Sequence, residues 1–326
     1  MTLTKPLLAV VTAIVLLTSP HTRAKEYPSR PITLVVPFAA GGPVDTLARI
    51  ISAPMSKTLG QPIIVENLPG AAGSIAVGRV AKATPDGYTL SIGHWATHVI
   101  NGAIYPLQYD LIKDFEPLGM IATNPMLIVA NPEIPANTFA DLVAWLKANP
   151  RKASMGTAGV GSATHIGGLS FRKETGAAVE FVPYKGSAPA MQDLLAGHIQ
   201  VMVDQPSNSL PFIRKGTIKA YAVTAKQRLQ SAPDIPTVDE IGYPGLQVSV
   251  WYGLWAPKGI DRAVIDRING ALRAALADSA VRKHLADLGQ ELPTPEQETP
   301  AGHGAYHRAE VEKWWPIIKA ANIKIE

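Results

Sequence analysis

The residues best placed to do chemistry lie in a glycine-rich turn near the start of the chain. The apolar run Ile32–Val36 ends at Pro37, and a helical pattern begins near Leu47. A turn between a strand and a helix presents the unpaired N–H groups of the first helical turn, which bind anions without a basic side chain. No lysine follows the glycines, as a nucleotide P-loop requires, so a carboxylate is expected rather than a phosphate. The expected ligand contacts here are Phe38, Ala39, Ala40, Gly41, Gly42, Pro43, Val44 and Asp45.

A second turn, residues 156–165, repeats this pattern with three glycines and a hydroxyl-rich helix start. One such loop is weak evidence, because structural turns also use glycine. Two such turns, one in each presumed lobe, favour a site in which each turn binds one end of the same ligand. The expected contacts in this turn are Thr157, Ala158, Gly159, Ser162, Ala163, Thr164 and His165.

Further candidates follow other predicted strands, whose carboxyl ends face the ligand crevice in an open α/β sheet. Asp204 could accept a hydrogen bond from the ligand, although a turn or helix cap is an equally good interpretation. The remaining candidates are wall residues of the pocket or members of a capped turn: His94, Trp95, Tyr184, Gly186 and Ser187.

Catalytic and metal-binding interpretations are not favoured. A nucleophile elbow at Ser162 needs glycines two residues before and after it, where Val160 and Thr164 stand. His303 and His307 have a spacing that can bind metal, but Gly304 occupies the position of a zincin's general base. We therefore interpret this pair as a solvated helix face, and expect no catalytic residue, no metal and no cofactor.

Strand-like and helical segments alternate along the chain, which predicts a mainly parallel α/β sheet in each of two lobes. A long apolar and aromatic segment, 248–256, can pass from one lobe to the other, and three helical segments follow it. The expected architecture is a two-lobe α/β fold with a ligand cleft between the lobes, the C-terminal helices packing on lobe 1. The expected boundaries are 25–126 with 251–326 for a discontinuous lobe 1, and 127–250 for lobe 2.

The N-terminus decides the expected compartment. Lys5, an apolar segment 7–17 and the small-x-small site ending at Ala24 are typical of a secretory signal peptide, so residues 1–24 are expected to be removed on export. The chain has 326 residues, no cysteine and a formal net charge of +4, without the basic runs that nucleic-acid binding favours. A monomeric, periplasmic protein is expected.

Several motifs stand together in one order, and on them the chain resembles the periplasmic receptors of tripartite tricarboxylate transporters, the Bug family. They are PFAAGGPVD from Pro37, VENLPGA from Val65, PDGYTL from Pro85, VPYKG from Val182 and PT from Pro236. The resemblance implies a periplasmic-binding-protein fold that closes on a small organic acid, and delivery to the small and large membrane subunits of a transporter. It implies carboxylate binding by backbone amides, small hydroxyls and water at the Phe38–Asp45, Thr157–His165 and Tyr184–Ser187 segments.

Val44 departs from the family pattern, because many relatives carry a hydroxyl residue there. With His94 and Trp95 beside the cleft, this change favours a ligand acid that carries an aromatic ring or another large apolar group. The alternative is that Trp95 packs between lobes and Val44 faces the core. Two other function classes remain open: a ligand-presenting sensor partner, which shares the same cleft, and a secreted hydrolase, which lacks a recognisable catalytic set.

Overall fold

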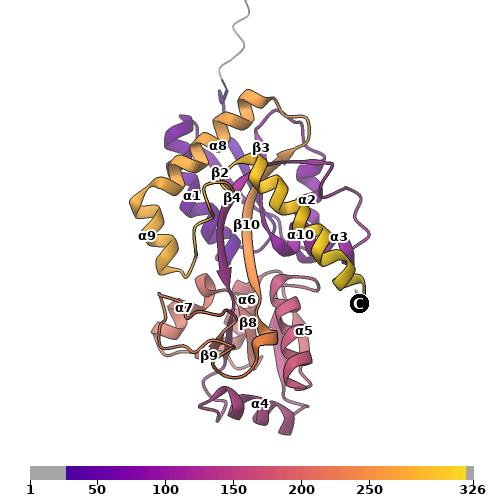
Figure 1. The fold of residues 1–326 in the computed structure, drawn as a ribbon, viewed down its shortest axis with the longest axis vertical. Helices are drawn as coiled ribbons and strands as arrows, with labels where there is room; N and C mark the ends of the chain where they lie inside the picture. Colours follow the sequence, from indigo (N-terminus) through magenta and orange to yellow (C-terminus); the bar gives the residue numbers. More distant parts are fainter. Residues whose placement is uncertain (1–26, 321–326) are drawn as a thin grey trace, which may run out of the picture.

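A computed structural model describes residues 27–320, so the expected signal peptide, residues 1–24, lies outside the described residues. Two separate five-stranded sheets organise the chain (Figure 1). The first has the order β2-β1-β3-β10-β4, and we call this sheet with its helices the first lobe. Its strands are β1 (Ile32–Val36), β2 (Ile63–Asn67), β3 (Thr89–His94), β4 (Phe115–Pro125) and β10 (Ser249–Pro257).

The second sheet, with its helices, forms the second lobe and has the order β7-β6-β8-β5-β9. Its strands lie within one continuous stretch of chain: β5 (Leu127–Ala130), β6 (Ser154–Thr157), β7 (Glu180–Pro183), β8 (Val201–Asp204) and β9 (Lys219–Val223). The expected boundaries at residues 126 and 250 stay a prediction, although the strand assignments divide the chain near them.

The sheets are mainly parallel, as expected, but each contains one reversed strand: four strands run in one direction, and β10 in the first sheet or β5 in the second runs against them. β1 is parallel to β2 and β3, and β6 is parallel to β7 and β8. The antiparallel ladders all involve β10 or β5, which pair with β3, β4, β8 and β9. The reason is the route of the chain: it leaves the first lobe along β4 and returns along β10, and these two strands run side by side down the long axis (Figure 1).

Helices cover both sheets. The first lobe carries α1 (Pro43–Leu59), α2 (Ser74–Ala81), α3 (Asn101–Ile104), α8 (Arg262–Ala277), α9 (Ser279–Asp287), α10 (Pro300–Ala320) and the short turns η1 (Ala71–Gly73) and η2 (Ala96–Ile100). The second carries α4 (Phe139–Ala148), α5 (Ala163–Thr175), α6 (Ser187–Leu195), α7 (Pro206–Arg214) and η3 (Pro244–Leu246). Within residues 27–320, no helix is long and apolar enough to cross a bilayer.

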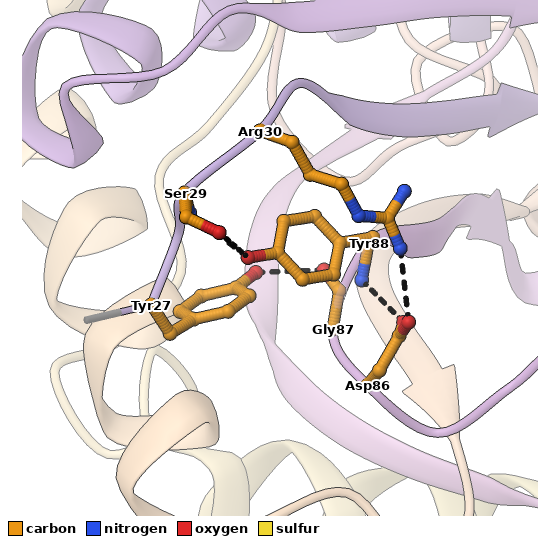
Figure 2. A network of polar contacts seen from close by, with 6 residues as sticks. All are labelled: Tyr27, Ser29, Arg30, Asp86, Gly87 and Tyr88. Atoms are coloured by element: carbon orange, nitrogen blue, oxygen red, sulfur yellow. Dashed lines mark hydrogen bonds and ion pairs between the residues drawn. The ribbon is translucent and has the colours of Figure 1, made fainter. Parts of the chain in front are cut away.

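The beginning of the described chain is anchored on the turn before β3 (Figure 2). The Tyr27 hydroxyl donates to the Gly87 carbonyl at 2.6 Å, and the Arg30 guanidinium donates to Asp86 at 3.0 Å. The same guanidinium lies 3.8 Å from the centre of the Tyr88 ring. These contacts fix the segment that leads into β1.

The interpretation of His303 and His307 as a solvated helix face is wrong. Both are buried, because α10 packs on β4 and η2 and turns this face inward. His98 stacks on the Trp255 ring at 3.6 Å, and the His307 Nε2 lies 2.6 Å from the His98 carbonyl oxygen. Among the described residues, no group of three or more His, Cys, Asp or Glu side chains is placed to hold a metal ion.

Candidate ligand-binding site

The turn between β1 and α1 is held by its own aspartate. Gly41 has a φ of +80°, which favours glycine, and its N–H donates to Asp45 Oδ2 at 2.8 Å. Arg49 donates to the same oxygen at 2.9 Å. Burial raises the pKa of Asp45, but these hydrogen bonds outweigh it and leave the pKa below its ordinary value. Asp45 therefore stabilises the turn as a carboxylate, and α1 begins at Pro43 without a side-chain cap from Gly42.

The turn between β6 and α5 is held by hydroxyl groups. Ser162 caps α5 by accepting from the His165 N–H at 3.3 Å, and its Oγ lies 2.9 Å from Thr164 Oγ1. Thr164 Oγ1 also accepts from the Ala158 N–H at 2.7 Å. The Gly161 N–H donates to His165 Nδ1 at 3.1 Å, which turns that ring toward its own helix.

Two more helices begin nearby without side-chain caps. Gly186 precedes α6 and has no side chain, and Gln205 precedes α7 with a side chain that makes no hydrogen bond to the first turn. First-turn N–H groups have no partner within their own helix, and the helix dipole makes this end positive.

The starts of α1, α5, α6 and α7 meet at one cavity between the lobes. Its lining residues are Phe38, Pro43, Val44, His94, Ala158, Ser162, Ala163, Thr164, Ser187 and Gln205. None of them is a lysine, arginine, aspartate or glutamate. Hydroxyls, backbone groups and helix starts thus supply the polarity of this site, which is suited to an anion.

The cavity is nearly closed. The empty space at the cavity, including the part open to solvent, is about 260 Å³, and the part that the centre of a water molecule can occupy is about 10 Å³. A single water needs roughly that much. A ligand larger than water can therefore enter only when the lobes separate or the lining residues move.

His94 is the one lining residue with an ionisable ring, and its protonation is well defined. Its Nδ1 accepts from the backbone N–H groups of Ala96 at 3.1 Å and Thr97 at 3.4 Å. Burial lowers the pKa of His94 to about 4, so the ring is neutral near pH 7. Because Nδ1 accepts, the ring proton is on Nε2, and His94 is a neutral donor.

Comparison with known proteins now decides the class. The family model described as the tripartite tricarboxylate transporter family receptor matches residues 47–323. The chain belongs to this family. Family members, including the Bug proteins, are periplasmic solute-binding receptors and not enzymes.

Relatives cover nearly the whole receptor. A protein of Agrobacterium vitis from the TAR-I ttuE-ttuC' intergenic region is 42% identical over 91% of this chain and 86% of its own length. BugT of Bordetella pertussis is 33% identical, with 93% of each protein covered. The structure of MatC from Rhodopseudomonas palustris with bound malate has a TM-score of 0.86 at 39% identity, covering 90% of this chain and 100% of that one. Rpa4515 of R. palustris with adipate has a TM-score of 0.86 at 34% identity, covering 92% of this chain and 99% of that one.

The cavity of this receptor is lined by nine of the residues that the sequence analysis put forward. Whether they bind a ligand stays a prediction. Ala39, Ala40 and Gly41 lie beside it and line an outer groove between α6, α7 and α9. Gly42 directly precedes α1, and Gly159 packs against Ala72 of the first lobe.

The structure turns several nominated side chains away from the cavity. Trp95 is buried, and its ring packs edge-on against Trp314 at 4.9 Å, so it does not line the pocket as the sequence suggested. His165 packs on Phe181, and the Tyr184 hydroxyl donates to Asp193 at 2.6 Å.

Three other residues put forward from the sequence do not line the cavity and are packed within the structure around it. Gly186 lies against the backbone of Ala39, and Thr157 is buried in β6. Asp204 is fully buried and accepts from Asn208 and Ser209, each at 2.7 Å. Burial raises the pKa of Asp204, although these hydrogen bonds oppose the shift.

Gln205 is the lining residue that the sequence reasoning missed. The signal was present, because Gln205 follows the end of β8 and precedes Pro206 at the first position of α7, a pattern typical of a helix start. Its amide oxygen accepts from the Tyr252 hydroxyl at 2.5 Å.

Three hydrogen bonds join the two lobes around the cavity. The Ala39 N–H donates to the Lys185 carbonyl at 3.1 Å, and the Tyr105 hydroxyl donates to the Val160 carbonyl at 2.5 Å. The third is the bond from Tyr252 to Gln205. The receptor is therefore in a closed arrangement.

Proposed function

We propose that this receptor binds a short aliphatic dicarboxylate between its lobes. The observation that carries the proposal is the convergence of four helix starts, one from the first lobe and three from the second, on a cavity without a cationic side chain. Helix N-termini from different directions can stabilise negative charge at both ends of one ligand. The binding of malate by MatC and of adipate by Rpa4515 supports this ligand class.

An aromatic acid, which the sequence favoured, is less well supported. The ring expected to stack on the ligand, Trp95, packs on Trp314 instead. The remaining aromatic wall consists of Phe38 and His94, whose ring centres are 5.2 Å apart.

The receptor is proposed to act in the periplasm, after removal of residues 1–24, and to deliver its ligand to the small and large membrane subunits of a transporter. Mass spectrometry of the exported protein tests the cleavage after Ala24. Uptake of labelled malate by cells that carry those subunits, with and without the receptor, separates transport from sensing. The proposed lobes are 25–126 with 251–326, and 127–250.

A thermal-shift panel followed by calorimetry tests the ligand class. The panel contains malate, succinate, adipate, citrate, benzoate and phthalate. A ligand that binds only the folded protein stabilises it by about 2.7 kcal/mol at a concentration of 100 times Kd. We expect the largest shift from malate, succinate or adipate. Stabilisation by benzoate or phthalate alone would support the aromatic acid instead, and no stabilisation by any of the six would contradict both.

A further inference from the structure

Gln205 occupies a distinctive place in the cavity. It follows β8 of the second lobe, its side chain is buried, and it lines the cavity at the start of α7. An amide carries both an acceptor and a donor, so what a ligand meets depends on which end of the amide the protein already holds.

Tyr252 holds the acceptor end. Its hydroxyl lies 2.5 Å from Gln205 Oε1, and its ring packs edge-on against His94 at 5.9 Å. Burial raises the pKa of Tyr252, and the charge of Asp204 adds to the shift, so the hydroxyl keeps its proton and donates it. The Gln205 amide nitrogen is thereby left as the donor that a ligand can use.

The bond also crosses the hinge. Tyr252 belongs to β10, where it pairs with His94 of β3 and Ala122 of β4 in the first lobe. Gln205 belongs to the second lobe, so separation of the lobes lengthens the distance between these two side chains. We therefore expect this hydrogen bond to break when the lobes separate.

We propose that Tyr252 is a positioning residue that orients Gln205 on closure, so that the Gln205 amide nitrogen donates to a ligand carboxylate from the second lobe. This rests on the proposed function, because the acceptor is a carboxylate oxygen. Closure and ligand recognition then share one hydrogen bond: the closed lobes orient the amide, and the ligand bound to the amide favours the closed lobes.

Binding of malate and adipate to single and double variants tests the pair. The variants are Tyr252→Phe, Gln205→Met and their combination. Since one hydrogen bond contributes about 0.5–1.5 kcal/mol, we expect Tyr252→Phe to weaken binding about three- to tenfold. In the double variant, we expect the loss of the hydroxyl to add nothing to the effect of Gln205→Met.

Tyr221→Phe is the matched control. The Tyr221 hydroxyl is also buried, but it donates to the Ala136 carbonyl at 2.9 Å within the second lobe. This variant should lower the melting temperature and leave the affinity unchanged. Unchanged affinity in Tyr252→Phe, or fully additive effects in the double variant, would overturn the proposal.

Lobe separation without ligand gives an independent readout. The chain has no cysteine, so Lys57→Cys and Lys173→Cys, on exposed positions of α1 and α5, place one spin label on each lobe. We expect Tyr252→Phe to shift the inter-label distances toward longer values in the ligand-free protein, and Tyr221→Phe to leave them unchanged. If the unmodified receptor binds neither acid, the proposed function fails, while these distances still decide whether Tyr252 stabilises closure. Identical distributions with and without the hydroxyl would refute it.

Discussion

Acidification should destabilise this receptor, because five histidines are buried in the neutral form. Burial lowers the pKa of His94, His165 and His307 to about 4, and lowers that of His98 and His303 well below the ordinary value. A histidine in an unfolded chain has a pKa of about 6.5. Between pH 6.5 and 4 the unfolded state therefore binds more protons, and the free energy of unfolding decreases as the pH falls.

The size of the effect follows from these values. At pH 5, each of His94, His165 and His307 costs about 2 kcal/mol relative to neutral pH, or about 6 kcal/mol together. This is a large part of a typical folding free energy of about 5–15 kcal/mol. The raised pKa of Asp204 opposes the effect, because the native carboxyl takes up its proton at a higher pH than the unfolded one.

Urea unfolding without ligand at pH 7.5 and pH 5.0 measures the difference. His307→Phe should make the pH dependence shallower by about one proton, or about 1.4 kcal/mol per pH unit at the steepest point. His284→Gln, on the exposed face of α9, is the control and should keep the original slope. Equal stability at both pH values, or the original slope in His307→Phe, would show that the buried histidines do not control acid stability.

Three further predictions concern the cavity. Gly41→Val places a β-branched residue at a φ of +80° beside Ala188. We expect this variant to fold and to bind malate at least tenfold more weakly by calorimetry. Normal binding would mean that the turn has only a structural role. Ser162→Ala removes the cap of α5 and a cavity hydroxyl, and should cost about 1 kcal/mol in urea unfolding and weaken malate binding; an unchanged unfolding midpoint would contradict the capping role. Aspartate should bind more weakly than malate in a competition titration, because its ammonium group meets helix N-termini and no carboxylate in the lining; equal affinity would contradict this electrostatic account.

Local patterns predicted much of the fold. The alternation of strand-like and helical runs located β1, α1, β6 and α5, because these elements follow from short-range hydrophobic periodicity and glycine-rich turns. The same turns brought the starts of α1 and α5 to one cavity. What the patterns did not provide was the direction of β10, which depends on where the chain re-enters the first lobe.

Side-chain direction was harder to predict than element position. Trp95 directly follows His94 at the end of β3, yet one lines the cavity and the other packs on α10. His303 and His307 share a helix face, as their spacing requires, but that face packs near His98, about 200 residues earlier. No short-range pattern encodes such a partner.

The position of β10 in its sheet has a consequence for the order of folding. β10 lies between β3 and β4, so before residues 249–257 are synthesised the first sheet is divided into β2-β1-β3 and an unpaired β4. All strands of the second sheet lie earlier in the chain, within residues 127–223. A nascent chain can thus complete its middle lobe while the lobe that begins at its N-terminus still lacks a central strand. Contacts between distant segments form slowly, so the first lobe of a nascent chain stays incomplete until residues 249–257 have been made.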